Sequence, residues 1–220
     1  MGRRLVILLV ALAALAAGCG GKSSSGEDTK TALQIYHDAQ KAAVGAKGVH
    51  IAGSITDAGK RVQLVFDLGP ASGKGTMSQG SARADVERVG KLAYMRANSQ
   101  FWTEFANAQA AQLLHDKWLS GSAAKTPFKS FASFLSLGAL INSGFPNHGH
   151  LKKLGVRTYK GQKVVAIEDP ATKDTLLVAD TGTPYPVAAI GDGQVAFSNW
   201  NAAVDVQAPK DAVDISSLGG

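Results

Sequence analysis

The pattern of hydrophobic and polar positions changes its period near the start of the chain. Apolar residues recur every three to four positions from Lys30 to Ala46, which predicts an amphipathic helix. After Gly48 the period becomes two, which predicts a β-hairpin with one apolar face around a turn at 57–60. Short alternating segments follow, separated by glycines. Because the connections are too short for crossover helices, we expect an antiparallel meander, continued by strands at 74–79, 83–89 and 91–97.

The middle of the chain carries large apolar residues without a clear strand pattern. Residues 101–118 are flanked by aromatic side chains, and we expect a helix around Asn107–Leu114. After Thr126-Pro127, the segment Phe128–Ile141 is apolar on almost every side. Its roughly 14 residues are fewer than the about 20 that cross a bilayer. The pattern therefore predicts a helix that is buried in the fold or lines a cavity.

Strand patterns return in the last third of the chain, each bounded by Gly, Pro or Asp turns. Runs of strands and helices, in place of regular alternation, predict the α+β class with an antiparallel sheet. The two blocks of strands are candidates for two halves of one sheet, and a single sheet of this size must curl strongly. The predicted strands of the second block are 151–159, 163–168, 174–180, 186–190 and 194–199, with a last one at 204–207.

The first residues are typical of a secretory signal that ends in a lipidated cysteine. Arg3 and Arg4 precede an uninterrupted apolar segment, and LAAGC then ends at Cys19, the only cysteine of the chain. This layout predicts cleavage between Gly18 and Cys19 and acylation of Cys19, for example with palmitate. The alternatives are an ordinary signal with an incidental cysteine and an N-terminal membrane helix. The apolar segment is shorter than the about 20 residues that such a helix needs.

This start divides the chain into three expected regions. Residues 1–18 form the signal peptide, 19–30 a flexible tether and 31–217 a single folded domain. As a random coil, the polar segment from Gly20 to Lys30 would span about 18 Å. We expect an extracytoplasmic protein anchored to the membrane through acylated Cys19. Since no second cysteine remains, the folded part has neither a disulfide nor a thiolate metal site.

The charge of the chain argues against a nucleic-acid partner. The net charge of +6 falls to +4 once Arg3 and Arg4 are removed with the signal. Apart from the pair Lys152–Lys153, the basic residues are scattered, whereas a nucleic-acid site concentrates them on one face. A weak attraction to anionic lipid headgroups is the more natural consequence.

Candidate catalytic and metal-binding patterns are weak throughout the chain. Gly69–Gly75 lacks the spacing and the following helix of a phosphate-binding loop, and we expect a turn there. His148 and His150 are the only close pair of histidines and lack an evident third ligand, so we expect solvated loop residues. The carboxylates at 168–169, 211 and 214 lie in turn or terminal contexts. We therefore predict no enzyme activity, no metal and no cofactor.

The large apolar residues of the middle segment leave two interpretations open. They fill the core of a curved sheet, or they line a hydrophobic cavity of the kind that curved antiparallel sheets often leave. In the second case, small residues on the strands would make room for a ligand. These are Ala52, Gly53, Ala84, Ala166, Ala188 and Ala189.

Several stretches of the chain resemble one family of bacterial lipoproteins. A lipobox precedes a Ser/Gly-rich tether, a single helix and the hairpin VHIAGSITDAG from Val49. The further stretches are GKLAYMRANSQFW, KWLS, YKGQKVVAIEDP, LLVADTGTPYPVAAI and VAFSNWNAAVDVQAP. On these residues, the chain resembles the actinobacterial LppX/LprG/LprA/LprF lipoproteins. Their wider fold group includes the LolA/LolB lipoprotein carriers.

The resemblance implies a fold and a function. The fold is a single strongly curved antiparallel sheet, a half-barrel with helices packed on its concave face. Several members hold acyl chains of glycolipids or other envelope lipids in a hydrophobic cavity. We therefore expect a membrane-anchored lipoprotein that binds or transfers a lipid or glycolipid acyl chain. The alternative is a lipid-free envelope module that engages a protein partner or serves as a sensor.

The candidate lining residues of the expected cavity are apolar side chains of the hairpin, the middle segment and a late strand. They are Val62, Leu64, Phe66, Tyr94, Phe101, Trp102, Phe131, Phe134, Leu135 and Phe197.

Overall fold

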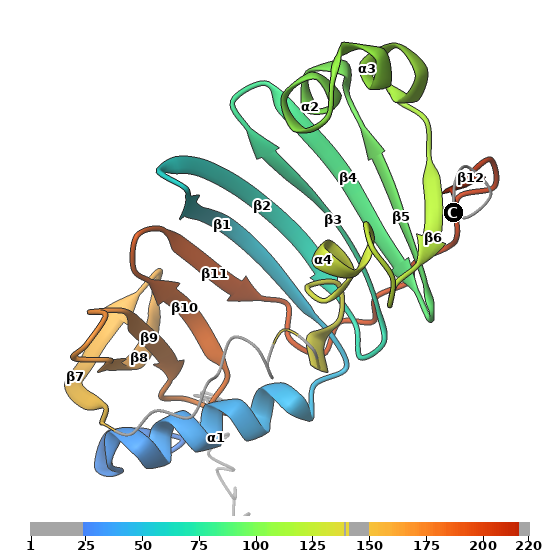
Figure 1. Cartoon of the computed structure of the whole chain (residues 1–220). Helices are drawn as coiled ribbons and strands as arrows, with labels where there is room; N and C mark the ends of the chain where they lie inside the picture. The colour runs from blue at the N-terminus through green and yellow to red at the C-terminus, as the bar shows by residue number, and fades with distance from the viewer. Residues whose placement is uncertain (1–23, 139, 141–149, 216–220) are drawn as a thin grey trace, which may run out of the picture.

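The computed structural model describes residues 24–138, 140 and 150–215, and these form one large open sheet with a few helices (Figure 1). The first meander contains β1 (Val49–Asp57), β2 (Lys60–Leu68), β3 (Ser72–Gln79), β4 (Ala82–Val89), β5 (Leu92–Ala97) and β6 (Leu119–Ser122). The second contains β7 (Lys152–Tyr159), β8 (Gln162–Glu168), β9 (Thr175–Ala179), β10 (Pro186–Ile190) and β11 (Gln194–Ser198). The short β12 (Val213–Asp214) lies at one edge.

The two blocks of strands join into a single twelve-stranded sheet, in the order β12-β6-β5-β4-β3-β2-β1-β11-β10-β9-β8-β7. The junction is the antiparallel ladder between β1 and β11, in which Ile51 lies opposite Phe197. All ladders are antiparallel except the one between β12 and β6. The prediction of one antiparallel sheet built from two halves is therefore confirmed.

The helices are few and short. Those with bounds inside the described residues are the 3-10 helix η1 (Glu27–Thr29) and the α-helices α1 (Ala32–Val44), α2 (Ser99–Phe105), α3 (Ala108–Leu114) and α4 (Lys129–Ala132). The expected helices near 30–46 and 107–114 are thus present as α1 and α3. Within the part of the chain that the structure describes, no helix has the length and apolar character needed to cross a membrane.

Strand register divides the side chains of the sheet between two faces. Ile51 lies opposite Phe66 and Phe197, and the same parity continues through Val86 on one side and Val165 on the other. We call this the helix face, because both α1 and the segment that contains α4 pack against residues of this parity. The other side, which carries Asp85 and Ala166, is the opposite face.

Helix α1 begins at a capping box and packs on one end of the helix face. Thr31 accepts a hydrogen bond from the backbone N–H of Gln34, whose side chain accepts one from the N–H of Thr31, so both free donors are satisfied. Ile35 and Ala39, fully buried, pack with Tyr36 against side chains of β8 and β9. The apolar stripe read from the sequence is therefore the packing face of the helix.

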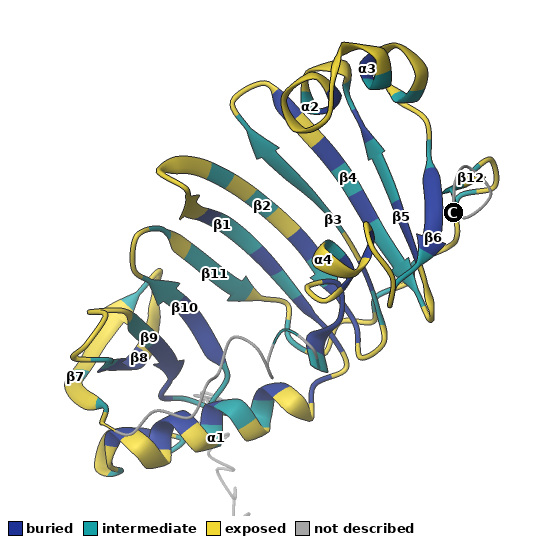
Figure 2. Cartoon of the chain, in the orientation of Figure 1, coloured by how far each residue is buried: buried dark blue, intermediate teal, exposed yellow. Residues whose placement is uncertain are grey.

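Strands β8 and β9 are buried on both faces. Val165 and Ile167 lie under α1, while Val164 and Ala166 belong to a separate cluster on the opposite face with Leu177. The strands from β7 to β11 are twisted enough that Gln194 Nε2 in β11 donates to Tyr159 Oη in β7 at 2.6 Å, across three intervening strands. Figure 2 shows dark blue along parts of β8, β9 and β10, beside the exposed edge strand β7.

The continuous helix predicted for Phe128–Ile141 is wrong for the described residues. Lys129–Ala132 is α-helical as α4, turns and bends follow at 133–136, and positions 137, 138 and 140 are again helical; position 141 lies outside the described residues. Two serine hydroxyls donate to backbone carbonyls inside this segment, Ser130 Oγ to Pro127 at 2.9 Å and Ser133 Oγ to Ser130 at 3.0 Å. Such local bonds compete with a regular helix.

Two further expectations about strands and turns are corrected. The expected strand at 204–207 is coil, and its first residue lies close to Gly48, where a Cβ would come within 3.0 Å of Val204 Cγ2. Beyond this coil, β12 pairs with β6, a strand the pattern did not predict. The expected turn at 69–75 is shorter, because β3 already begins at Ser72.

The end of the expected tether is fixed to the sheet. The backbone N–H of Ser25 donates to the Asp180 carbonyl at 3.0 Å, and that of Asp28 donates to Asp180 Oδ1 at 3.1 Å. These bonds hold residues 24–30 against the end of β9, so a tether extending to Lys30 is too long. Residues 1–23, with Gly18 and Cys19, lie outside the described residues.

Candidate functional site

A strip of half-buried apolar side chains runs over the central strands of the helix face. Burial decreases along β1 and β2 toward their hairpin: Val49 and Leu68 at one end are buried, whereas Ile55 near the turn is 42 % exposed. Two half-buried side chains of β11 continue the strip beside β1. The apolar strip, as we call it from here, comprises Ile55, Val62, Leu64, Met77, Val195 and Phe197.

The strip extends over four neighbouring strands of the sheet. Four strands, β11, β1, β2 and β3, contribute to it, and β1 spans it from the level of Ile51 to Ile55. At about 4.8 Å between strands and 3.3 Å per residue, this is an area of about 14 Å by 13 Å. Exposed apolar area of this kind on a sheet face is available for a ligand or a partner.

The close approach of β1 and β11 depends on a glycine in the strip. A Cβ at Gly53 would lie 2.0 Å from the Gln194 carbonyl oxygen and 2.7 Å from Val195 Cα. Any side chain there would push β11 away from β1. Gly53 therefore keeps the two blocks of the sheet continuous beneath the strip.

Elsewhere on the helix face, aromatic rings of the protein itself fill the space above the glycines. A Cβ at Gly75 would lie 1.9 Å from the ring of Phe66, and one at Gly121 would lie 2.5 Å from the ring of Phe128. Of the small residues expected to make room for a ligand, three lie on the opposite face and only Gly53, Ala84 and Ala189 on the helix face. Their positions therefore do not outline one cavity.

The predicted lining residues are partly brought together. Leu64, Phe66, Phe131, Leu135 and Phe197 belong to one cluster over the central strands, with Phe66 and Leu135 buried in it. Val62 lies beside Leu64 on the same face, nearer the hairpin.

The other predicted residues lie elsewhere. Phe101 and Trp102 belong to a second cluster beneath α2, which Phe131 also touches. Phe134 is 48 % exposed. Tyr94 is buried on the opposite face, because Met95 pairs with Val86 on the helix face and Tyr94 has the other parity. Tyr94 therefore cannot share a cleft with Leu64.

Two hollows in the described part of the chain are polar and lie away from the strip. One, of about 420 Å³, is bounded by Glu27, Lys30 and Asp38 beside α1. The other, of about 450 Å³, lies between the turns at 172–175 and 190–192. Neither contains a predicted lining residue. The strip is thus an open surface rather than part of either hollow.

The polar hollow beside α1 is organised by buried charge. Lys30 Nζ lies 2.7 Å from Glu27 Oε1 and 2.6 Å from Asp38 Oδ2. Burial raises the pKa of Glu27, although the Lys30 ammonium acts in the other direction. Hydrogen bonds to Asp38 and Glu27 raise the pKa of Lys30. Together with the 2.5 Å pair between Lys163 and the buried Asp180, this network fixes the first described residues to the sheet.

The opposite face of β3–β5 carries a second charged network. Asp85 accepts from Thr76 at 2.8 Å, from Arg83 at 2.9 Å and from Arg96 at 3.0 Å. Burial alone would raise the pKa of Asp85, but these hydrogen bonds outweigh it and lower the pKa. The Arg96 guanidinium also lies 4.9 Å from the centre of the Trp118 ring. Because these bonds join Thr76 on β3, Arg83 and Asp85 on β4 and Arg96 on β5, the network holds the three strands together.

One row of polar residues contains the side-chain types of a hydrolase. His50 Nδ1 lies 2.7 Å from Asp67 Oδ1, and Ser198 is the neighbour of His50 across the β1–β11 ladder. Between these described residues, however, no hydrogen bond joins Ser198 to His50. The row lies on the opposite face and coincides with neither polar hollow. The sequence did not indicate this row, because strand pairing alone brings its members together.

Among the described residues, no group of three or more His, Cys, Asp or Glu side chains could hold a metal ion. His150 is described and exposed, whereas His148 lies outside the described residues.

No family model and no curated protein matches the chain. Solved structures do. LprF from Mycobacterium bovis is similar over 86% of this chain and 99% of its own, with a TM-score of 0.53 and 17% identity. An uncharacterized conserved protein from Thermus thermophilus is similar over 84% and 98%, with a TM-score of 0.44 and 8% identity. The MucA/MucB complex from Pseudomonas aeruginosa is similar over 82% of this chain and 62% of the matched chain, with a TM-score of 0.39 and 14% identity. The chain therefore has an LprF-like fold built on a single open antiparallel sheet, as its resemblance to that family predicted.

Proposed function

We propose that this chain is an extracytoplasmic lipoprotein, anchored through acylated Cys19, that accepts the acyl chain of a lipid or glycolipid on the apolar strip. The observation that carries the proposal is the strip itself, an area of half-buried Leu, Val, Ile, Met and Phe on the helix face. The LprF-like fold supports it, since the resemblance implies acyl-chain binding in that family. In this proposal, the helix face is the concave side of the curved sheet.

The mechanism is transfer by burial. A methylene group gains about 0.8 kcal/mol on leaving water, whether it enters a bilayer or an apolar protein surface. Exchange of a chain between the membrane and the strip is therefore nearly balanced in free energy. Met77 lies within the strip, and both Met77 and Met95 pack against the buried cluster of Phe66 and Leu135. Their unbranched side chains adapt to chains of different shape.

The experiment uses one strand with two faces. Val62 and Val65 both lie on β2, Val62 in the strip and Val65 on the opposite face, where it is 47 % exposed. Val62→Asn is expected to weaken binding of the fluorescent fatty acid cis-parinaric acid about three- to tenfold, as the loss of about 1 kcal/mol requires. Val65→Asn is the matched control and is expected to leave binding unchanged.

A second measurement identifies the bound species. Mass spectrometry of the intact protein, purified from its own envelope, is expected to show both the lipid on Cys19 and a co-purifying lipid. Leu64→Trp, which fills the strip, is expected to lower the amount of that second lipid. Equal parinaric acid binding by the Val62→Asn and Val65→Asn proteins, with no co-purifying lipid, would sink the proposal.

A second candidate function is a lipid-free module that docks a protein partner. It is favoured by one observation: the strip is open, and neither polar hollow provides an enclosed apolar volume. The same variants distinguish the two functions. A protein module would show no parinaric acid binding, and a protein captured from the envelope would be lost with Val62→Asn but retained with Val65→Asn.

A further inference from the structure

The edge strand β7 has an unusual distribution of charge. From Leu151 to Gly161 the chain has four basic residues and no acidic one. The carboxylate of Glu168 lies across the ladder from Lys152, but it belongs to β8. The local excess of positive charge equals the net charge of the whole chain after residue 18. The four basic residues are Lys152, Lys153, Arg157 and Lys160.

Apolar side chains of the same strand are exposed between these charges. Leu154 is 42 % exposed and Val156 is 47 % exposed. Among the described strands, β7 pairs only with β8 and stands at the edge of the sheet, at the left of Figure 1. A basic strand with exposed apolar side chains has the composition of a surface that contacts anionic lipid headgroups.

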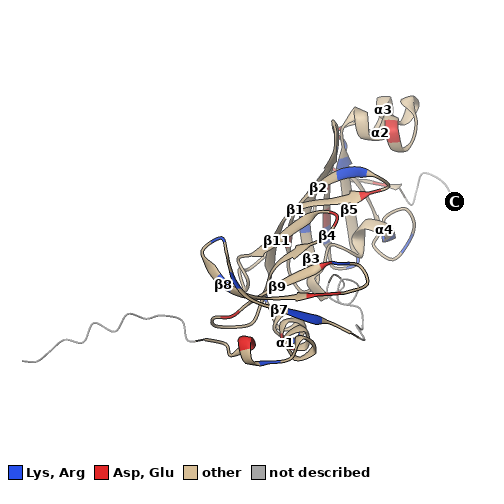
Figure 3. Ribbon diagram, turned by 90° about the vertical axis from the view of Figure 1, so that its left-hand side faces the viewer, with Lys and Arg blue, Asp and Glu red and all other residues tan. Residues whose placement is uncertain are grey.

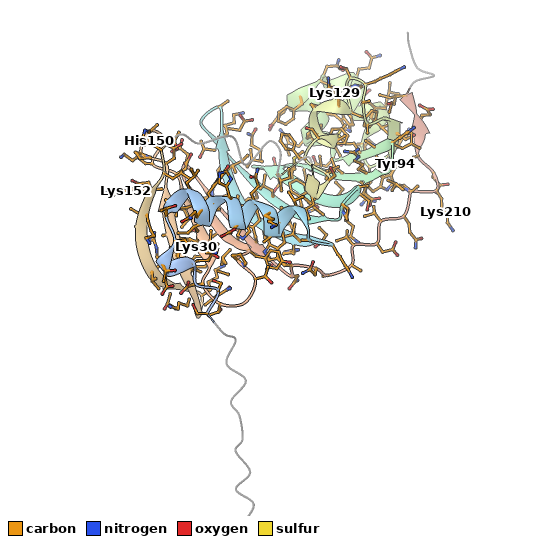
Figure 4. All side chains as sticks on the ribbon, turned by 90° about the horizontal axis from the view of Figure 1, so that it is seen from below. Lys30, Tyr94, Lys129, His150, Lys152 and Lys210 are labelled. Atoms are coloured by element: carbon orange, nitrogen blue, oxygen red, sulfur yellow. The ribbon has the colours of Figure 1, made fainter. Side chains whose placement is uncertain are left out.

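Contacts at both ends of β7 connect it to the residues through which the chain continues toward Cys19. At its start, Lys153 Nζ donates to the carbonyls of Lys30 at 2.7 Å and Asp28 at 3.1 Å. Near its end, Thr158 pairs with Lys163 of β8, and the Lys163 ammonium lies beside the Asp180 carboxylate. The backbone carbonyl of Asp180 in turn accepts a hydrogen bond from the N–H of Ser25. Figure 3 shows β7 next to the first described residues, and Figure 4 shows Lys152 and Lys30 on the same side of the molecule.

Covalent geometry then limits where the anchor lies. Five peptide units separate Ser24 from Cys19, so the acylated cysteine is at most about 17 Å from the point where residue 24 is held. If the tether extended to Lys30, the domain would be free to turn over on the membrane. Because residues 24–30 are fixed, the corner of the sheet that carries β7 is held close to the bilayer surface.

We infer that the outer edge of β7 is the surface with which the anchored protein contacts an anionic membrane, with Val156 on the helix face and Arg157 on the opposite face of this edge, and with Leu154 and the following Lys160 beside them. The inference rests on the proposed anchor at Cys19 but not on lipid binding in the strip. The contact lies at the depth of the headgroups, where water satisfies the free backbone groups of the edge strand. Lysines also protect an edge strand from pairing with a second copy, and the experiment below includes that outcome.

The test uses the single native cysteine. In the acylated protein the thiol of Cys19 is blocked, so Val156→Cys introduces the only reactive thiol, and pyrene maleimide labels it. Gln109→Cys on α3 provides a label on an exposed position far along the sheet. The two acylated proteins are reconstituted into vesicles with about 30% phosphatidylglycerol and a headgroup spin-labelled phosphatidylcholine as quencher. The label at 156 is expected to be quenched at least threefold more strongly than the label at 109.

Charge reversal tests whether electrostatic attraction contributes to the contact between β7 and the anionic membrane. Arg157→Glu with Lys160→Glu is expected to reduce the quenching at 156 at least twofold, and replacing phosphatidylglycerol by neutral lipid is expected to do the same. Lys60→Glu with Lys91→Glu makes an identical change in net charge at two exposed hairpin positions and is expected to have no effect.

Each outcome has a distinct meaning. Flotation with vesicles measures the anchor, and a protein that does not float overturns both the anchor and the membrane surface. A protein that floats but shows equal quenching at 156 and 109 overturns only the inference about β7. Pyrene excimer emission from 156 that rises with protein density shows that β7 pairs with a second copy, and this also overturns it. Equal effects of the two charge reversals contradict an electrostatic contact.

Discussion

Strands β8 and β9 are buried on both faces, whereas β1 and β2 lose burial along their length toward the hairpin. In β8, α1 covers Val165 and Ile167 on the helix face, and Val164 and Ala166 are buried in a second cluster on the opposite face. In the central strands, the helix face is buried only at the end near Val49, and the apolar strip remains half exposed.

The two regions also differ on the opposite face. Under β8–β10 it is apolar and buried around Leu177, while under β3–β5 it carries the hydrogen-bonded carboxylate of Asp85. One end of the sheet thus obtains its stability from apolar burial on two faces. The other combines one apolar face with a polar network. Side chains are free to contact a ligand only where the fold does not bury them, and the site proposed over the central strands meets this condition.

The largest expected effect is at the doubly buried end. Leu177→Ala removes a side chain that is 1% exposed and leaves a cavity, so we expect a loss of about 3 kcal/mol in the free energy of unfolding. Urea denaturation followed by circular dichroism measures it.

The matched substitution in the strip is Leu64→Ala. Leu64 is half-buried and has an open side, so we expect a loss of about 1 kcal/mol or less. Equal losses for Leu177→Ala and Leu64→Ala would mean that the strip is part of the core, and the comparison between the two regions would then be wrong.

An effect smaller than that of Leu177→Ala is expected where a ring fills the space above a glycine. At Gly121, a new Cβ would lie 2.5 Å and 2.6 Å from two atoms of the Phe128 ring, and the other atom within 4 Å also belongs to that ring. Gly121→Ala should therefore destabilise the protein by about 1–3 kcal/mol, and thermal unfolding measures the change.

A variant of Phe128 tests whether the destabilisation by Gly121→Ala comes from contact with the Phe128 ring. In a Phe128→Leu background, the cost of Gly121→Ala should fall by at least half, because the smaller side chain can move away. Gly138→Ala is the control, since the nearest atom to its Cβ is 3.9 Å away, and its effect should be near zero. An undiminished cost in the Phe128→Leu background would place the strain in the backbone of β6.

Local patterns predicted the elements, and long-range pairing decided what they form. The period of α1 and of the hairpins is set by neighbouring residues, so those elements could be predicted. β6 could not, because Leu119–Ser122 contains Gly and Ser in place of branched residues and forms by pairing with β5. The sequence predicted β8 as a strand but not its burial on both faces, although a run such as VVAI is typical of strands buried in that way.

The candidate site was predictable only where one face is clearly apolar. On β2, strict alternation places Leu64 and Phe66 together, and both lie on the helix face. On β5, each face carries a mixture of side-chain sizes, and the small Ala93 and Ala97 lie on the helix face while Tyr94 lies on the other. The size of Tyr94 was therefore a misleading signal. The basic character of β7 was visible in the sequence, but its place at a sheet edge was not.

The last prediction concerns the charged network on the opposite face: the effect of Asp85→Asn on the free energy of unfolding should depend on pH. The pKa of Asp85 is lowered below its ordinary 3.8, so the folded state favours the charged carboxylate. A group of this kind contributes stability above its unfolded pKa, and the contribution is lost as the pH falls through the folded pKa. Asp85→Asn keeps one acceptor for Thr76 and should cost about 1 kcal/mol at pH 7.

The difference between the wild type and Asp85→Asn, measured by urea denaturation at several pH values, should shrink steadily as the pH falls below 3.8. Asp57→Asn, at the exposed β1–β2 hairpin, is the control and should show no difference at any pH. A gap between the wild type and Asp85→Asn that stays constant down to pH 2 would show that Asp85 acts through shape and not charge. In that case the two ends of the sheet would both depend on packing, and the charged network would be a consequence of strand pairing rather than one of its causes.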